Sequence, residues 1–488
     1  MTSLPNVLLI VMDTARAKTV YDHPEVMPNV HEIAQEGTTF TNAFSTAPWT
    51  LPSHASMFTG RYTSGHGTHA RSTRFDPEYP PLARRLDDAG YRTAAFSNNT
   101  WIAPEFGFGQ GFDQFSTWLK VVDGGVDLEE IARGKDGLVE QGLAVGKSLF
   151  RRDGHRTFLN AVYAKFLKER YDSGARLNNW KIRRWLTEHG DGEEPFFVFA
   201  NYLEPHLDYD PPGEFRTRFL PADVDRADLD GVNQDPWAYI CDQVSMDRTD
   251  FEALRALYRG ELNYLDYRLG NLYDHLDESG LLEETLIVIV GDHGENIGEH
   301  GLMDHQYCLY DTLLRVPLLV RYPEAFPPGE RFDGLVEVRD LFPTILQAAD
   351  QSVTDPAASD ESLQQALDDG GREYVFGEYA APRPSMEALE ERVGDVPPEV
   401  REYDRALRSI RSEEWKLIQA SSGETELYDV AADRDETNDV SDEAPDTVAS
   451  LSGTLERKLD TFELGADDET TMSQSTRERL EELGYLQG

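Results

Sequence analysis

Carboxylate and imidazole side chains follow two strongly apolar runs of the sequence. Asp13 comes directly after the run at residues 5–12, and Asp292 and His293 follow the run at residues 285–290. Oxygen and nitrogen donors of this kind suit Mn²⁺, Zn²⁺ or a related divalent cation. A turn or capping role is the alternative for each residue taken singly, so the prediction of a metal site depends on the three lying together in the fold.

A hydroxyl group, that of Thr50, is placed by its neighbours at the start of a short helix. Pro52 is tolerated at a first helical position, residues 53–59 can form two turns, and Gly60 is a C-terminal stop. The N-terminus of a helix carries partial positive charge and favours a phosphate, a sulfate or an alkoxide. A plain N-cap is the alternative for this threonine.

Two further histidines occupy similar places in the chain. His206 follows the apolar run at residues 195–201, and His305 comes shortly after the glycine-rich stretch at residues 291–301. An imidazole near a strand end can transfer protons or bind a metal, although loop histidines are commonly only solvated. Both are therefore candidate site residues whose role depends on their position in the fold.

The apolar runs indicate the kind of sheet that would bring these residues together. The runs at residues 5–12, 195–201 and 285–290 are apolar on both faces, as in parallel strands covered by helices on each side. A helix over 82–89 followed by a strand over 91–96 adds one βαβ step. Ligands of such sheets gather at the carboxyl ends of the strands. The predicted fold class is α/β, with a mostly parallel sheet between helices.

The pattern changes along the chain and predicts two domains. Residues 1–350 are expected to form the catalytic α/β domain, with a helical insertion at about 121–190, an acidic loop over 211–250, an amphipathic helix from 251 and a last helix over 338–349. A polar stretch at 351–372 is expected to be a linker. Residues 373–488 should form a small α+β subdomain, with short strands at 374–378, 408–411, 415–419 and 426–428 and helices near 444–464 and 474–483.

The charge of the chain is extreme for its 488 residues. It carries 90 acidic and 46 basic residues, a formal net charge of -44, and only nine of the basic residues are lysines. This composition is similar to that of proteins from salt-loving archaea with molar internal salt, where a Debye length of roughly 3 Å screens self-repulsion. An ordinary acidic protein is the alternative. Such a charge repels nucleic acid and anionic membranes, so neither is expected as a partner.

The sequence also indicates where the protein works. Cys241 and Cys308 give no disulfide framework and no metal-ligand spacing. The apolar run that ends on Asp13 is too short for a signal peptide, and no run is long enough to cross a bilayer. A cytoplasmic protein without an integral membrane segment is therefore expected; its oligomeric state is unknown.

Taken together, these motifs resemble the sulfatase branch of the alkaline phosphatase superfamily. The resemblance rests on segments that occur in the family's order along nearly the whole chain: residues 5–14, 50–62, 204–206, 291–301, 315–318, 415–418 and 427–429. It implies an alkaline-phosphatase-like core and an ester hydrolase that acts on phosphate or sulfate esters.

The sequence departs from the sulfatase pattern at several positions. Thr50 stands where sulfatases have a Cys or Ser that is oxidised to formylglycine, and threonine cannot be converted to that aldehyde. Thr14 replaces the second of two tandem Asp ligands, His54 replaces an Arg, and Ser97, Asn98 and Asn99 replace a Lys and a His. The pattern is more similar to phosphodiesterase and phosphoglycerol-transferase relatives with a plain Thr nucleophile. An enzyme without formylglycine is therefore expected.

The resemblance assigns expected roles to the site residues. Asp13, Thr50, Asp292 and His293 should hold a divalent metal ion (Mn, Zn, Mg or Ca), and Thr50 should attack the ester. His206 and His305 should contact ester oxygens or protonate the leaving group, Asn98 should bind substrate, and His54 should help to neutralise the intermediate. The expected substrate is a small-molecule, lipid or glycan ester. A transferase of phospho head groups and an inactive member that binds an anion are the alternatives.

Overall fold

The computed structural model describes residues 4–117, 172–222, 224–359, 361–459, 462 and 472–482. Most of the predicted helical insertion at 121–190 lies outside these residues. Its last part is helix α9 (Ala175–His189). Among the described residues, no helix has both the length and the apolar character needed to cross a bilayer.

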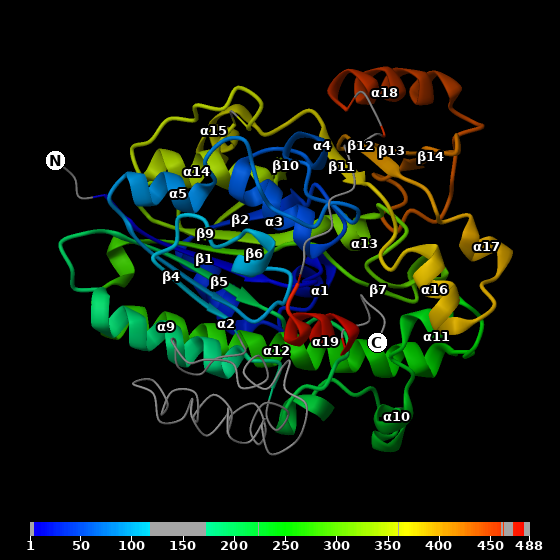
Figure 1. Ribbon diagram of the computed structural model, residues 1–488, viewed down its shortest axis with the longest axis horizontal. Helices are drawn as coiled ribbons and strands as arrows, with labels where there is room; N and C mark the ends of the chain where they lie inside the picture. The colour runs from blue at the N-terminus through cyan, green and yellow to red at the C-terminus, as the bar shows by residue number, and fades with distance from the viewer. Residues whose placement is uncertain are drawn as a thin grey trace, which may run out of the picture.

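An eight-stranded sheet forms the centre of the molecule (Figure 1). Its order is β10-β2-β9-β6-β1-β5-β3-β4, and all neighbouring strands run parallel except the two pairs that include β9. The strands are β1 (Asn6–Met12), β2 (Thr38–Phe44), β3 (Arg92–Ser97), β4 (Gln114–Thr117), β5 (Phe196–Tyr202), β6 (Thr285–Gly291), β9 (Arg315–Arg321) and β10 (Glu330–Glu337). The predicted α/β fold with a mostly parallel sheet is confirmed.

Alternate residues of β1 belong to the two hydrophobic cores on either side of the sheet. Val7, Leu9 and Val11 lie in one core, and Leu8, Ile10 and Met12 lie in the other. This alternation follows from the two-residue period of a strand, and it explains why the run is apolar throughout. Figure 1 shows α3 (Thr50–Thr59), α5 (Leu82–Asp88), α14 (Leu341–Ala348) and α15 (Leu363–Asp369) on one side of the sheet, and α2 (Pro28–Ile33), α9 and α12 (Arg248–Glu278) on the other.

Helix α12 is the longest described helix, with 31 residues. Asp247 caps its N-terminus and forms a reciprocal capping box with Asp250, which satisfies backbone N–H groups that have no partner inside the helix. Its buried leucines, among them Leu254, Leu262 and Leu269, belong to the same hydrophobic core as Leu8, Ile10 and Met12 of β1. The amphipathic helix predicted from residue 251 is confirmed, and it starts slightly earlier, at Arg248.

The predicted C-terminal antiparallel sheet is also present, in the order β11-β12-β13-β14. Its strands are β11 (Val375–Tyr379), β12 (Leu407–Arg411), β13 (Trp415–Ala420) and β14 (Thr425–Asp429), and α18 (Pro445–Lys458) packs on it. The last described helix, α19 (Gln474–Glu482), lies elsewhere, because its Leu480 belongs to the core beside β1. The domain boundaries themselves stay predictions.

Two segments and three strands differ from the sequence expectation. Residues 211–250, expected to be a loop, contain the 3₁₀ helix η3 (Gly213–Thr217) and the short helices α10 (Arg226–Gly231) and α11 (Pro236–Ile240). The expected linker at 351–372 contains α15, which Ser362 caps through the N–H of Gln365. Strands β2, β4 and β10 are not predicted by the sequence, because polar residues interrupt their apolar pattern.

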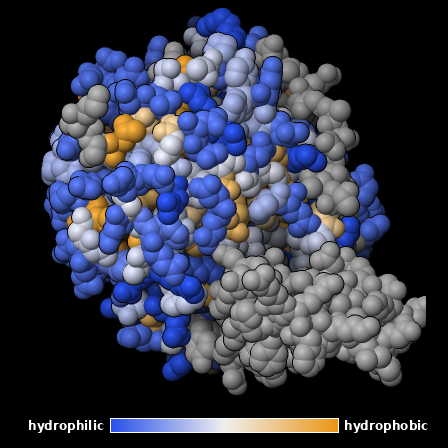
Figure 2. All heavy atoms as spheres, turned by 60° about the vertical axis from the view of Figure 1, so that its left-hand side comes forward, coloured by the Kyte–Doolittle hydropathy of each residue, from blue (hydrophilic) through white to orange (hydrophobic). Residues whose placement is uncertain are grey.

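Further elements connect these layers. They are α1 (Ala17–Asp22), α4 (Thr63–His66), α13 (Asp311–Leu314), α16 (Met386–Val393), α17 (Pro398–Arg401), β7 (Asn296–Ile297), β8 (Met303–Asp304) and the 3₁₀ helices η1 (Ala34–Glu36), η2 (Pro104–Phe106), η4 (Leu282–Glu284), η5 (Glu299–Gly301) and η6 (Val338–Asp340). On the face drawn in Figure 2, hydrophilic residues dominate the coloured surface and hydrophobic ones form small, separate areas.

Candidate active site

Two neighbouring parallel strands and one helix bring the predicted site residues together. Met12 of β1 pairs with Gly291 of β6, so Asp13 and Asp292 follow matched strand ends. Helix α3 starts at Thr50, with Trp49 as its N-cap. Asp13, Thr50, Asp292 and His293 come from segments far apart along the chain, and the fold brings all four into one fully buried group.

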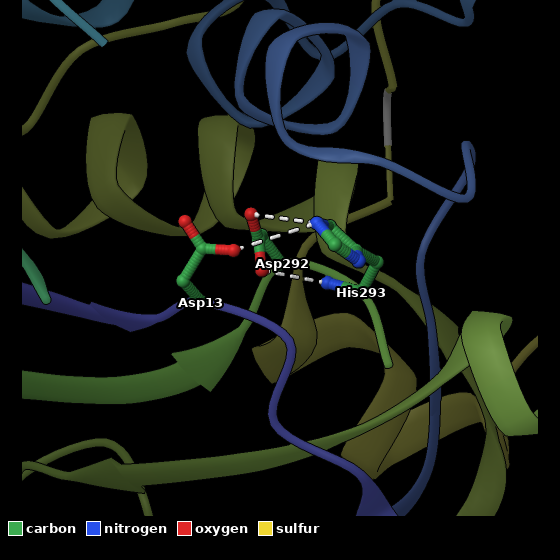
Figure 3. A group of neighbouring side chains, drawn as sticks. All are labelled: Asp13, Asp292 and His293. Atoms are coloured by element: carbon green, nitrogen blue, oxygen red, sulfur yellow. Dashed lines mark hydrogen bonds and ion pairs between the residues drawn. The ribbon is translucent and has the colours of Figure 1, made fainter. Parts of the chain in front are cut away.

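The possible ligand atoms of Asp13, Asp292 and His293 point toward one another (Figure 3). Nε2 of His293 lies 3.6 Å from Oδ1 of Asp13 and 3.5 Å from Oδ2 of Asp292. Nδ1 of His293 donates to the carbonyl of Gly294 at 2.8 Å, which leaves a lone pair on Nε2. A neutral imidazole held in this way by a backbone carbonyl is the form that binds metals.

Two of these oxygen atoms lack a hydrogen-bond donor. Oδ1 of Asp13 and Oδ2 of Asp292 are buried and accept no hydrogen bond, although the other oxygen of each carboxylate does. Buried carboxylate oxygens without a partner are strongly unfavourable, and a divalent cation is a partner that satisfies both at once. The residues present therefore fit a metal ion of the type that carboxylate and imidazole ligands prefer.

The titration of the group agrees with this assignment. Burial raises the pKa of Asp13 from 3.8 to about 7, even though Asn99 donates to this carboxylate. Burial and the negative charge of Asp13 raise the pKa of Asp292 well above its usual value. Burial also lowers the pKa of His293, and the positive charge of His305 adds to the effect. Two carboxylates this close resist joint ionisation unless a cation offsets their charge.

The hydroxyl of Thr50 points into this group and does not cap its own helix. Its Oγ1 lies 3.3 Å from Nε2 of His293. The N-cap residue is Trp49, whose side chain makes no capping hydrogen bond, so the capping alternative does not describe Thr50. Gly60 ends α3 in a left-handed conformation with φ 70°, as the sequence predicts.

His54 lies one turn further along α3 and is also fully buried. Its Nδ1 donates to the carbonyl of Thr50 at 2.9 Å, and its Nε2 lies 3.1 Å from the side-chain amide of Asn201. Burial lowers the pKa of His54 to about 4, so the ring is neutral near pH 7. As a neutral ring it can donate and accept hydrogen bonds, but it does not supply the positive charge expected of it.

His206 and His305 face each other next to the possible metal ligands Asp13, Asp292 and His293, called the metal group below. Their ring centroids are 5.3 Å apart, and the ring centroid of His305 lies 4.6 Å from that of His293. Although burial lowers it, the carboxylate of Asp304, 2.5 Å from Nδ1, raises the pKa of His305 well above its usual value. The ring of His305 is therefore protonated near pH 7.

The ring of His206, in contrast, is neutral near pH 7. Burial lowers the pKa of His206 to about 4, and the positive charge of His305 acts in the same direction. Its Nδ1 donates to the carbonyl of Leu207. The pair thus combines a neutral ring with a protonated one, and a protonated ring can act as a general acid.

The sequence placed Asn98 in the site, but the structure brings Asn99 to the metal group instead. Nδ2 of Asn98 donates to the carbonyl of Ser173 at 2.8 Å, and its Oδ1 accepts from the N–H of Leu203 at 2.8 Å. Asn98 thus connects the ends of β3 and β5. Nδ2 of Asn99 donates to Oδ2 of Asp13. Substrate binding by Asn98 stays a prediction, with its amide already engaged within the protein.

Several residues of the site were missed by sequence reasoning. They are Asn99, Asn201, Glu295 and Asp304, all of them buried. Each lies at a strand end or within two residues of a motif histidine, so position alone could have indicated them. Asp304, Glu295 and His305 form a second group of possible metal ligands. Nδ1 of His305 lies 2.5 Å from Oδ1 of Asp304 and 3.4 Å from Oε1 of Glu295, so the ring already pairs with both carboxylates.

Comparison with known proteins identifies the class. The family model described as Sulfatase matches residues 5–351, so the chain belongs to the sulfatase family, within the alkaline phosphatase superfamily. The prediction of a sulfatase-like ester hydrolase is confirmed at the level of the family.

Individual relatives agree with this membership. An arylsulfatase of Clostridium perfringens is 25% identical over 411 residues, which cover 77% of this chain and 82% of that protein. The crystal structure of a phosphonate monoester hydrolase of Agrobacterium radiobacter has a TM-score of 0.64 at 21% identity and covers 93% of this chain and 95% of its own. A structure solved with its substrate D-glucosamine-2-N,6-O-disulfate has a TM-score of 0.66 at 20% identity, covering 96% and 100%. These structures share the fold.

Proposed function

We propose that this protein is a metal-dependent hydrolase of phosphate or sulfate esters that uses Thr50 as its nucleophile. The observation that carries the proposal is the position of the Thr50 hydroxyl, 3.3 Å from Nε2 of His293, which forms a group of possible metal ligands with Asp13 and Asp292. A bound divalent cation would lower the pKa of a hydroxyl beside it and withdraw charge from the ester. Asp13, Asp292 and His293 would hold that cation, and Thr50 would complete its ligands.

The protein's own groups account for the two steps of the reaction. The ionised Oγ1 of Thr50, its proton lost to solvent, attacks the phosphorus or sulfur atom, and the bond to the ester oxygen breaks. His305, whose pKa is raised, is the group that can protonate the departing alkoxide. Water then attacks the adduct on Thr50, gives its proton to the now neutral His305, and releases phosphate or sulfate. The oxygen of Thr50 leaves the adduct as an alkoxide and takes a proton from solvent, which restores its hydroxyl.

The nucleophile favours phosphate over sulfate as the transferred group. A formylglycine hydrate can eject sulfate by collapsing to the aldehyde, whereas a threonine ester must be hydrolysed at the phosphorus or sulfur atom itself. The central atom must therefore accept a nucleophile in both steps. We expect aryl phosphates or phosphodiesters to be turned over faster than aryl sulfates. Small molecules, lipids and glycans that carry such an ester are the proposed substrate class.

A panel of substrates tests the proposal. Aryl phosphate, phosphodiester, phosphonate monoester and aryl sulfate are compared in molar KCl, with Mn²⁺, Zn²⁺, Mg²⁺ or Ca²⁺ supplied in turn. Thr50→Ala should lower the rate by roughly 10⁴ or more, as for a nucleophile within a coupled site. Thr50→Ser, which keeps a hydroxyl, should retain much more of it. Mass spectrometry of quenched turnover should find a phosphoryl adduct on the peptide that contains Thr50.

Two results would each contradict a part of this proposal. One is a preference for sulfate over phosphate esters, which would contradict the argument from the threonine. The other is a Thr50→Ala variant with the wild-type rate, which would show that another group attacks. Because Thr50→Ser differs from the wild type by one methyl group, it separates loss of the hydroxyl from loss of packing.

We also propose that the protein works in molar salt, as in a halophilic organism. The support is the net charge of -44 combined with nine lysines in 488 residues. Screening over a Debye length of roughly 3 Å at 1 M salt removes most of the repulsion between surface carboxylates.

A further inference from the structure

A cleft of about 710 Å³ lies between the central sheet and the C-terminal sheet. Its lining comes from α1, from strands β2, β9 and β10 at one edge of the central sheet, from β12, and from the turns after β12 and β14. Neither the metal group nor His206 and His305 belong to this lining. Sites for small molecules usually have volumes of roughly 300–1,000 Å³, so the cleft is large enough to hold a ligand of its own.

Basic side chains are concentrated in this cleft. Five of its lining residues are acidic, whereas six are basic, namely Arg16, Lys18, Arg315, Arg331, Arg411 and Arg434. The whole chain, by contrast, has 90 acidic and 46 basic residues. The cleft is therefore much richer in basic residues than the chain as a whole.

Three of the six basic groups have a carboxylate partner. They are Arg16 with Glu299, Lys18 with Asp435 and Arg411 with Asp311, at N···O distances of 2.9, 2.5 and 3.0 Å. The other three, Arg315, Arg331 and Arg434, make no ion pair with any carboxylate of the described residues. In a chain with so many acidic residues, three guanidinium groups at one cleft thus keep their charge available to a ligand.

Arg315, the first residue of β9, is half-buried, and it is the least exposed of these three arginines. Its Nε and Nη2 both donate to the carbonyl of Thr41, at 3.1 and 2.7 Å. Asp311 lines the same cleft, but its two oxygens already accept from Lys416 at 2.6 Å and from Arg411 at 3.0 Å. Arg315 thus has a positive charge partly withdrawn from water and no carboxylate paired with it, an arrangement that a bound anion would stabilise.

The other two arginines lie nearer to solvent. Arg331, in β10, and Arg434, in the turn after β14, are exposed. The acidic residues that remain without a basic partner in the cleft, Asp22, Asp333 and Glu413, are exposed as well. Water and molar salt screen exposed charges over roughly 3 Å, whereas a half-buried charge is screened less. The unpaired guanidinium of Arg315 therefore dominates the inner part of the cleft.

We infer that this cleft is a second anion-binding site of the protein, which takes a small hydrophilic ligand through a phosphate or sulfate group. Guanidinium groups bind such groups well, because their forked N–H donors match two oxygens at once. Arg315 binds the anion in the inner part of the cleft, and Arg331 and Arg434 bind it from the solvent side. The site is independent of the proposed function, and Arg411 and Arg434 lie beyond residues 5–351, which the family model matches.

The experiment removes one arginine of the cleft at a time. Metal-loaded protein is titrated by calorimetry with tetramethylene diphosphonate, which carries two tetrahedral oxyanions and no ester bond, at the lowest KCl concentration that keeps the protein folded. Inorganic phosphate is the second probe. Arg434→Gln and Arg315→Gln should each raise the Kd about tenfold, because each removes a charged hydrogen bond. Arg457→Gln, an exposed change of the same type on α18, should match the wild type.

Hydrolysis of an aryl phosphate, measured in parallel, separates the cleft from the candidate active site. Arg434→Gln should keep the wild-type kcat and KM while it weakens binding of the diphosphonate. Binding that depends on Arg434 in a protein that hydrolyses no tested ester would support the inference and end the proposed function. A KM that rises together with the Kd in Arg434→Gln would place the ligand in the active site and overturn the inference of a second site.

Two further results would overturn the inference: a wild-type protein that binds neither probe, and a Kd that is the same in Arg434→Gln, Arg315→Gln and Arg457→Gln. Tighter binding of the diphosphonate than of phosphate would support a ligand with two acidic groups, and equal affinities would support a single phosphate or sulfate group. A thermal melt of each variant checks the fold. If loss of the bonds to Thr41 lowers the melting temperature of Arg315→Gln, the exposed change Arg331→Gln takes its place in the comparison.

Discussion

At the scale of single residues, the site holds two buried carboxylates whose charges repel each other. Oδ1 of Asp13 and Oδ2 of Asp292 accept no hydrogen bond, and the pKa of each residue is raised. Without a cation these groups should destabilise the folded state, and a cation should reverse the effect. The same pair of residues therefore links metal content to stability.

Asp292→Asn should abolish metal binding. The amide keeps the shape of the side chain but removes one negative charge from the ligand set. Elemental analysis of wild-type protein purified without chelator should show about one equivalent of divalent metal, and the variant should show very little. Without metal, the variant should melt at a higher temperature than the wild type, because the repulsion with Asp13 is gone.

Asp88→Asn, at the exposed end of α5, is the matched control. It should keep both the metal and the wild-type response of the melting temperature to added cation. Full metal content in Asp292→Asn, or a fully active protein free of metal, would contradict the assigned ligands.

The sequence could indicate the residues of the metal group but not all of their contacts. Asp13, Asp292 and His293 follow apolar runs, and a parallel sheet brings such strand ends together. Asn99 and Asn201 contact Asp13 and His54 only because β3 and β5 lie on the same side of β1. Strand order is set by packing between distant segments, which a local pattern does not contain. The neutral state of His54 likewise follows from burial in the fold.

At the scale of elements, a buried group of charges joins the catalytic part to the C-terminal sheet. Nζ of Lys416, in β13, lies 2.6 Å from Oδ1 of Asp311, in α13, and 2.6 Å from Oε1 of Glu436. Although burial raises it, Lys416 and Arg411 lower the pKa of Asp311 to about 2. Burial raises the pKa of Glu436 from 4.5 to about 7, and Lys416 opposes the rise without cancelling it.

Glu436→Gln should change how stability depends on pH. The pKa of Glu436 is higher in the folded protein than in the unfolded chain, so the folded state binds more protons between about pH 4.5 and 7. Its contribution to stability is fully present below pH 4.5 and is lost as the pH rises to about 7. Relative to the variant, the wild type should lose roughly 1 to 3 kcal/mol of unfolding free energy over this interval.

Urea unfolding at pH 5 and pH 8 in molar KCl measures this difference. Glu443→Gln, an exposed change of the same type, should follow the wild type. A wild type and a Glu436→Gln variant with parallel pH profiles would show that Glu436 is ionised throughout this range in the folded protein.

The elements with continuous apolar runs could be predicted, and those with mixed patterns could not. Strands β1, β5 and β6 are buried along their whole length. By contrast, β10 starts with exposed or half-buried residues, among them Glu330 and Asp333, and β2 carries Thr41 and Asn42 beside it. These strands lie at one edge of the sheet, where only part of each needs to be apolar. The short helices over 211–250 bury few side chains each, so no periodic pattern indicates them.

At the scale of the whole molecule, the charge of -44 should make folding depend on salt. Carboxylates spread over one surface repel one another, and high ionic strength screens that repulsion. The melting temperature should rise steeply between low and molar KCl. Sucrose at equal osmolality, which does not screen charge, should raise it much less. A melting temperature that is flat or falls with KCl would indicate an ordinary acidic protein.

The order of strands in the central sheet has a consequence for the time course of synthesis. Strand β1 is apolar on both faces, yet its first partner, β5, starts at Phe196, and its second, β6, starts at Thr285. At a synthesis rate of about 5–20 residues per second, roughly 10 to 40 s separate β1 from β5, and longer separates it from β6. Throughout that interval the nascent chain carries an unpaired strand whose residues 7–12 are all apolar. The candidate metal ligands that follow β1 and β6 can meet only after β6 has been synthesised.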